Sequence, residues 1–184
     1  MSDFHFMLSD EEKTYLKDLV RQSIRAKLEG DESAAPAEPE SHKLRKEFGA
    51  FVTLKIDGQL RGCIGNVQGG GEIFQTIWDM ARAAAFSDPR FPPLSAEEFD
   101  KVDIEISILS PLNYCRSPEQ IEVGRHGLII QRNQNTGLLL PQVAVEQGWD
   151  KYQFLANTCR KAGLPEDCWN KVGTNILWFE AEIF

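Results

Sequence analysis

The sequence predicts an α+β protein with a largely antiparallel sheet, packed helices and one domain, with room for a smaller subsidiary lobe. Three observations predict it. Segments with period-two alternation are interleaved with segments of helical periodicity, and the turn Asp57-Gly58 joins two of the strands as a tight hairpin. The 184 residues suffice for one continuous core but are short for two independent domains.

The first helix is predicted at 10–29. Ser9 and Glu12 have capping-box spacing before an apolar stripe, and Gly30 provides a stop. The segment 31–41 that follows is acidic, contains proline and lacks the apolar content to fold by itself, so we expect a flexible surface loop that serves as a spacer.

A hairpin with strands at 50–56 and 59–64 comes next, followed by a glycine-rich loop at 66–71 and a helix at 72–86. Three prolines within 88–94 restrict the backbone and predict a stiff extended loop.

Ser95 and Glu98 then predict a short capped helical turn before a strand at 102–108. Its isoleucines share one face, so Glu105 is expected on the other face. The second half is predicted to contain three short strands, a helix that begins at Asp150 and stops at Gly163, and a final strand; these strands are 120–123, 127–131, 137–140 and 176–183.

The net charge of the chain indicates which binding partners to expect. The 28 acidic residues outnumber the 20 basic ones, giving a formal charge of -8, and there is no dense run of Lys or Arg. We therefore do not expect binding to duplex nucleic acid. No signal-like segment or bilayer-length apolar run is present, which predicts a cytoplasmic location without membrane association.

The four cysteines are Cys63, Cys115, Cys159 and Cys168, and they form no CxxC pair. Their wide spacing predicts reduced thiols, not a disulfide framework or a zinc site. The three histidines are too few for a multi-histidine centre, so no metal site is expected. Cys159 fits an apolar helix stripe, and we assign no functional role to it, to Cys115 or to Cys168.

The segment 60–65, Leu-Arg-Gly-Cys-Ile-Gly, is the best candidate for a functional centre. Simple strand alternation places Arg61 and Cys63 on one face, where the guanidinium would favour a nucleophilic thiolate. Gly62 and Gly65 would permit close approach of a ligand or of another backbone. A cysteine buried as a small hydrophobe is the alternative, and the residues alone leave both open.

This hexapeptide resembles the signature of the AMMECR family, known in prokaryotes as AmmeMemoRadiSam system protein A. Further segments resemble the family pattern in the expected order: 83–94, 104–107, 126–128, 139–143 and 146–149. The resemblance covers an AMMECR-like domain at 8–183, and the loop 31–41 within it does not map onto the pattern.

The resemblance implies a fold more firmly than an activity, because the family has no settled biochemical function. In prokaryotes the family is associated with a Memo-like protein and a radical S-adenosylmethionine protein, which implies a shared modification or redox pathway. The cofactor is unknown. The chain lacks the cysteine spacing that would hold the iron-sulfur cluster of radical chemistry.

Two further residues are candidates for proton transfer. His126 lies between glycines and suits a general base or a hydrogen-bond donor, although a turn histidine with a satisfied ring is the simpler interpretation. Glu105 lies in an isoleucine-rich strand and would orient His126 or Arg61; a solvent-exposed sheet face explains it equally well. Together with Cys63 they form the proposed catalytic set.

The ligand-binding candidates are the polar and aromatic residues of the stiff loop and of a strand end, together with the hexapeptide positions: Arg61, Gly62, Gly65, Asp88, Arg90, Phe91, Pro141 and Gln142. Arg90 would provide a fork for a carboxylate or phosphate. Loop rigidity alone accounts for the prolines, and Pro141-Gln142 also reads as a strand terminator.

Three functions follow from these residues. The leading hypothesis is an enzyme, or a component of an enzyme system, that uses Cys63 on a small molecule or a modified macromolecule. The second is a non-catalytic adaptor or ligand-binding module. The third is single-stranded RNA binding through Phe91, Trp149 or Tyr152, which the acidic balance disfavours.

Overall fold

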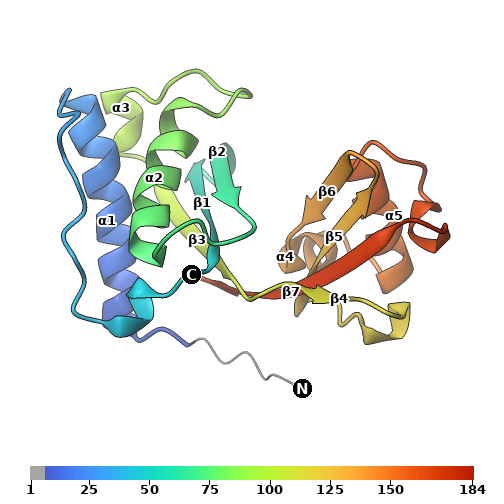
Figure 1. Ribbon diagram of the computed structural model, residues 1–184. Helices are drawn as coiled ribbons and strands as arrows, with labels where there is room; N and C mark the ends of the chain where they lie inside the picture. The colour runs from blue at the N-terminus through green and yellow to red at the C-terminus, as the bar shows by residue number, and fades with distance from the viewer. Residues whose placement is uncertain (1–6) are drawn as a thin grey trace. The chain divides into compact units, whose positions relative to one another are not determined.

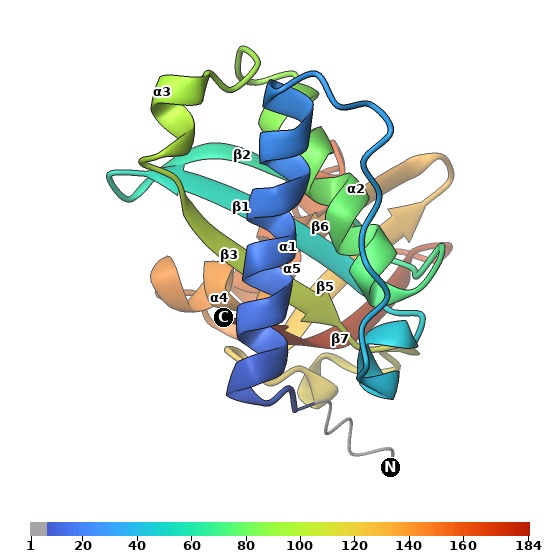
Figure 2. The same ribbon diagram turned by 90° about the vertical axis from the view of Figure 1, so that its left-hand side faces the viewer.

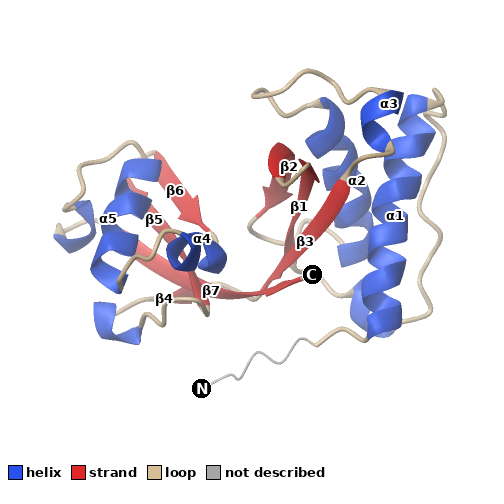
Figure 3. Cartoon of the chain, turned by 180° about the vertical axis from the view of Figure 1, so that it is seen from behind, coloured by secondary structure: helices blue, strands red, loops and turns tan. Residues whose placement is uncertain are grey.

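The computed structural model describes residues 7–184 and has a mixed α+β fold with antiparallel strand pairing, as the sequence predicts (Figures 1 and 3). The chain divides into two compact units. Unit 1 comprises the residues up to Leu109 together with Glu182–Phe184, and unit 2 is Ser110–Ala181. None of the helices in the described part of the chain has the length and apolar character needed to cross a membrane.

The sheet of unit 1 has the strand order β2-β1-β3, with β1 at Gly49–Ile56, β2 at Gln59–Asn66 and β3 at Asp103–Leu109. All pairs are antiparallel. Asp57 and Gly58 have φ angles of 52° and 74°, the two positive values that a type I′ hairpin turn requires. At the end of the chain, Phe184 exchanges two backbone hydrogen bonds with Ile106, at 3.2 and 2.9 Å.

Helices cover one face of this sheet, as Figure 2 shows for α1 and α2. They are α1 at Asp10–Leu28, α2 at Ile73–Phe86 and α3 at Ala96–Phe99, with a 3-10 turn η1 at His42–Arg45. The predicted capping box of Ser9 and Glu12 is present. The side chains packed between the layers are almost fully buried: Leu16, Val20, Ile24, Val52, Leu54, Ile77, Ala81 and Ile106. Each large aliphatic side chain among them stabilises the fold by about 1.5–3 kcal/mol.

The acidic segment 31–41 returns along α1 and α2 (Figure 2) and is held there by hydrogen bonds to its backbone. Tyr15 donates its hydroxyl to the Ala37 carbonyl at 2.8 Å. Arg45 donates from Nε and Nη2 to the Pro39 carbonyl at 3.1 and 2.9 Å. The segment, predicted as a spacer, thus forms part of the wall of unit 1.

Unit 2 is built on β5 at His126–Arg132, which pairs with β6 at Asn135–Leu139 and with β7 at Asn175–Ile183. The short strand β4 at Asn113–Tyr114 pairs with β7. Its helices are α4 at Pro141–Glu146, α5 at Lys151–Lys161, and the 3-10 turns η2 at Pro118–Gln120 and η3 at Cys168–Asn170.

Two features of unit 2 differ from the sequence prediction. The predicted strand 120–123 is wrong, because Ser117 and Gln120 form a capping box that begins the turn η2 instead. Helix α4 was not predicted; Pro141 occupies its first turn, where proline is favoured.

The described residues form two hydrophobic clusters, one in each unit, where one continuous core was predicted. The reason is that each unit has its own helices packed on its own strands.

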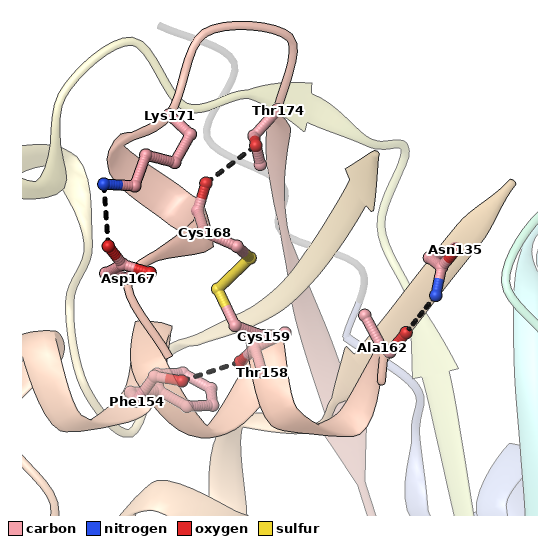
Figure 4. The surroundings of a disulfide bond; sticks show 9 residues. All are labelled: Asn135, Phe154, Thr158, Cys159, Ala162, Asp167, Cys168, Lys171 and Thr174. Carbon is pink, nitrogen blue, oxygen red and sulfur yellow. Dashed lines mark hydrogen bonds and ion pairs between the residues drawn. A yellow bond between two sulfur atoms is a disulfide. The ribbon is translucent and has the colours of Figure 1, made fainter. Parts of the chain in front are cut away.

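The prediction of four reduced thiols is wrong for two of them, because Cys159 and Cys168 form a disulfide (Figure 4). Cys159 lies in the last turns of α5 and Cys168 begins η3, and both are fully buried. The chain reverses between them, which brings their Cα atoms to 6.0 Å, within the range that a disulfide spans. Spacing in the sequence does not reveal this reversal.

Reduction of this disulfide is expected to lower the free energy of unfolding by about 2.5 kcal/mol, because the bridge closes a loop with a sequence separation of 9. The measurement is urea denaturation with and without a phosphine reductant. The double variant Cys159→Ala/Cys168→Ala is the control and should not respond to the reductant. A count of four free thiols in unfolded, unreduced protein would contradict the disulfide.

Candidate functional site

Cys63 lies in β2, at one end of a row of side chains that crosses the sheet of unit 1. The strand register pairs Cys63 with Thr53 of β1, and Thr53 with Glu105 of β3. Thr53 is 6% exposed and donates its hydroxyl to the sulfur of Cys63 at 3.2 Å. Cys63 itself is partly exposed and free of any disulfide. The thiol therefore has a fixed hydrogen-bond donor that sequence reasoning missed.

The backbone of Cys63 is bonded on its outer side by the loop that follows α2. Its N–H donates to Asp88 Oδ2 at 2.9 Å, and its carbonyl accepts from Arg90 Nη2 at 3.2 Å. Strand β2 is the edge of the sheet in unit 1, so these two groups would otherwise face outward unpaired. The side chains of Asp88 and Arg90 thus occupy the place of a neighbouring strand.

Asp88 and Arg90 also bond each other. Asp88 is 3% exposed and accepts from the Arg90 backbone N–H, Nε and Nη2 at 3.1, 3.0 and 2.7 Å. The hydrogen bond from the Arg90 guanidinium holds the pKa of Asp88 well below its usual range, against the opposing effect of burial. The same bond raises the pKa of Arg90. The loop is not extended over all of 88–94 as predicted, because Pro89 and Arg90 form a turn in which the Phe91 N–H donates to the Asp88 carbonyl at 3.1 Å.

A β-bulge at Arg61 changes the side-chain facing that simple strand alternation predicts. The register shifts between Leu54 and Lys55, so that Leu54 pairs with Gly62, Lys55 pairs with Leu60, and Arg61 is the extra residue of a bulge. Leu60 consequently shares the sheet face of Cys63, which corrects the predicted alternation.

The guanidinium of Arg61 forms an ion pair with Glu98 of α3. Nε and Nη2 donate to Glu98 at 2.8 and 2.9 Å, and Nη2 also donates to the Pro92 carbonyl at 2.9 Å. The pair lowers the pKa of Glu98 to about 2 and raises that of Arg61. Nη1 of Arg61 is buried without a partner among the described residues. Sequence reasoning recognised Glu98 as a helix cap and missed this second bond.

Phe91 lies between two cations. The guanidinium carbons of Arg61 and Arg90 are 5.8 and 5.6 Å from its ring centroid, within cation–π range. The ring therefore links the Arg61–Glu98 pair to the Asp88–Arg90 pair.

The two glycines of the hexapeptide are required by packing. A Cβ at Gly62 would lie 2.1 Å from the Ala84 carbonyl oxygen of α2, and a Cβ at Gly65 would lie 2.3 Å from the Phe51 ring. The sequence offered two reasons for glycine at these positions, the close approach of a ligand and the close approach of another backbone. In the structure it is other parts of the chain that approach closely.

Glu105 forms an ion pair with Lys55 at 2.9 Å, and both side chains are partly exposed. The register places Lys55 two residues from Thr53 on β1, so this pair lies on the same sheet face as Cys63. Arg61, one of the two partners predicted for Glu105, bonds Glu98.

The remaining candidates belong to unit 2 and are described within it. His126 begins β5, is 4% exposed, accepts the Glu122 N–H at Nδ1 at 3.1 Å and stacks on Trp178 at 4.2 Å. Burial lowers the pKa of His126, which favours the neutral ring. Pro141 is buried at the start of α4, and Oε1 of the adjacent Gln142 is buried without a partner in the described part of the chain.

Within residues 7–184, no three His, Cys, Asp or Glu side chains gather in a way that would hold a metal ion. The candidates Arg61, Cys63, Asp88, Arg90 and Phe91 come together in unit 1, joined by the contacts described above. The site is thus a cysteine on a bulged edge strand, enclosed by paired charges.

The fold and this site define a class: α+β proteins with a glycine-flanked cysteine in the edge strand of a hairpin. Comparison with known proteins is specific, since a model of the AMMECR1 family matches residues 17–184. The chain belongs to the AMMECR1 family, as the hexapeptide and the motifs that follow it predict.

Similar proteins occur in several organisms. The chain is 43% identical to Protein NEQ441 of Nanoarchaeum equitans over 176 residues, covering 92% of this chain and 97% of the relative. It is 42% identical over 184 residues to a protein of Methanothermobacter thermautotrophicus, covering 95% and 94%. The crystal structure of uncharacterised protein PH0010 from Pyrococcus horikoshii matches with a TM-score of 0.90 at 39% identity, covering 96% and 92%.

Proposed function

We propose that the protein is a thiol-dependent enzyme, or a component of an enzyme system, in which Cys63 reacts with a small molecule or a modified macromolecule. The observation that carries this proposal is the hydroxyl of Thr53 directed at the sulfur, at 3.2 Å. A hydrogen-bond donor favours a sulfur that bears negative charge, which is the nucleophilic form. Partial exposure gives a reagent access to it.

The contacts around Cys63 limit the types of reaction that its thiolate can carry out. Its backbone N–H already donates to Asp88, so it does not serve as a donor to an oxyanion. Direct displacement fits better: the thiolate forms a bond to an electrophilic carbon or sulfur, and the leaving group departs with the electron pair of the broken bond. Lys55, paired with Glu105 on the same face, can give that leaving group a proton.

The wider context of the proposal rests on the resemblance. It comprises a shared pathway with a Memo-like protein and a radical S-adenosylmethionine protein. The proposed cytoplasmic location rests on the sequence pattern alone. His126 is the weakest member of the predicted catalytic set, because the unprotonated nitrogen of its neutral ring, Nδ1, already accepts the Glu122 N–H; this favours the simpler interpretation of a turn histidine with a satisfied ring.

The test is the rate of alkylation by iodoacetamide, followed by peptide mass spectrometry. We expect Cys63 to react faster than Cys115, because burial raises the pKa of the Cys115 thiol. Thr53→Val should slow alkylation of Cys63 about tenfold, since a hydrogen bond to a charged group contributes about 1.5–3 kcal/mol. Thr53→Ser keeps the hydroxyl and is the matched control.

The proposal is wrong if Cys63 reacts no faster than glutathione at every pH, if Thr53→Val reacts like the wild type, and if Cys63→Ala retains function in cells.

A non-catalytic adaptor is the second candidate, and the closed ion pairs favour it. Arg61 is paired with Glu98, Arg90 with Asp88, and Lys55 with Glu105. Such pairs keep a loop in one shape for recognition without leaving a free charge for chemistry. Pull-down experiments separate the two candidates. If the protein is an adaptor, the Arg61→Gln and Arg90→Gln variants lose the partner, whereas the Cys63→Ala variant keeps it.

A further inference from the structure

We infer that the outer face of unit 1, where the segment 31–41 lies along α1 and α2, is a docking groove for an extended basic segment of a partner protein. The inference is independent of Cys63.

Three hollows lie in sequence along this face. One of about 480 Å³ lies between residues 34–38 and α2, one of about 330 Å³ lies between residues 38–41 and α1, and one of about 460 Å³ lies on the first half of α1. The first two share Glu38, and the last two share Glu11 and Tyr15. Because neighbouring hollows share these lining residues, the three lie end to end along the face, an arrangement that suits an extended chain better than a compact small molecule.

The floor of the second hollow is apolar and is lined by Tyr15, Pro39 and Leu44. Pro36 and the nearly buried rings of Phe74 and Trp78 line the first hollow, which exposes more polar than apolar surface. Hydrogen bonds from Tyr15 to Ala37 and from Arg45 to Pro39 hold the segment that forms one wall. The groove is therefore formed before a partner arrives, which reduces the entropic cost of binding.

The rim is acidic. Seven of the lining residues are Asp or Glu, and Arg82 is the one basic residue among them. Arg82 is held in the wall, where it donates to Ser23 and stacks on Trp78 at 5.1 Å. Within residues 7–184, Glu11, Glu40 and Asp79 have no ion-pair partner.

The occupant follows from shape and charge together. An aliphatic or aromatic side chain would fill the apolar second hollow, and lysine or arginine side chains on either side of it would meet the unpaired carboxylates at the rim. An acidic peptide would be repelled by the same rim.

The experiment is fluorescence anisotropy of the full chain with a labelled peptide that alternates lysine with leucine and glycine. A peptide with glutamate in place of lysine is the negative probe. The groove variant is Glu11→Gln/Glu40→Gln/Asp79→Asn. Its matched control, Glu29→Gln/Glu97→Gln/Asp100→Asn, removes the same charges from exposed positions of unit 1 outside the lining. Ala35→Trp fills the first hollow without changing charge.

We expect the lysine peptide to bind with a salt-sensitive affinity that the groove variant weakens about tenfold, because the variant removes three carboxylates that the lysines would meet. Ala35→Trp should also weaken binding, while the control triple should not. Equal losses in the groove and control triples would show only general attraction to an acidic protein and would overturn the inference. Unchanged binding in Ala35→Trp, or no binding by the wild type, would do the same.

Discussion

Gly62→Ala is expected to lower the free energy of unfolding by about 3 kcal/mol or more, the upper range for inserting a methyl group into a packed interior. The new Cβ would lie 2.1 Å from the Ala84 carbonyl oxygen and 3.1 Å from its carbonyl carbon. Both atoms belong to the backbone of α2, so no side-chain rotation relieves the clash. Strand β2 and helix α2 would have to separate, and the loop that carries Asp88 would move with the end of that helix.

The measurement is urea denaturation followed by far-ultraviolet circular dichroism. Gly70→Ala is the matched control, because a Cβ at Gly70 meets nothing within 4 Å. It should unfold within about 0.5 kcal/mol of the wild type. A Gly62→Ala variant as stable as Gly70→Ala would mean that β2 and α2 do not pack as closely as described.

Asp88→Ala is expected to lower the free energy of unfolding by about 3 kcal/mol. It should also raise the rate at which Cys63 is alkylated, because the edge strand β2 opens locally more often. It removes the acceptor of four hydrogen bonds, one from the Cys63 N–H and three from Arg90. Bonds that involve a charged partner are stronger than neutral ones, and no neighbouring strand replaces the lost acceptor.

The same carboxylate makes stability depend on pH. The pKa of Asp88 in the folded protein lies below its ordinary value of 3.8, so its contribution is fully present above that pH and is lost as the pH falls further. The pKa of Glu98, lowered from 4.5 to about 2, acts in the same direction. The stability difference between the wild type and Asp88→Asn should therefore shrink on acidification below 3.8.

Asp100→Asn is the control for both measurements, because Asp100 is exposed. It should follow the wild-type curve at every pH. A difference between the wild type and Asp88→Asn that stays constant from neutral pH to pH 2 would show that the Asp88–Arg90 bond does not stabilise the carboxylate.

The hairpin shows where prediction from the sequence stops. Asp57-Gly58 sets the turn, and an unbroken register from that turn would pair Cys63 with the fully buried Val52. The bulge at Arg61 shifts the register by one residue, so Cys63 pairs with Thr53 on the other face. A one-residue shift reverses the facing of every later side chain, and no local pattern in the hexapeptide announces it.

The partners of the candidate residues were equally hidden. Glu98 was visible as a cap and Asp88 as a loop residue, but their bonds to Arg61 and Cys63 span 37 and 25 positions of sequence. The disulfide is similar: Cys159 and Cys168 have no recognisable spacing, and only the reversal of the chain after α5 brings them together.

The sequence by itself determined the α+β class, the hairpin, the capped helices and the family, because each depends on local periodicity, turn chemistry or an ordered set of motifs. The tertiary structure decided which face Cys63 occupies, which groups bond it, which cysteines are joined and where the acidic segment forms a groove. These depend on strand register and on contacts between distant segments, which form only when the whole chain packs.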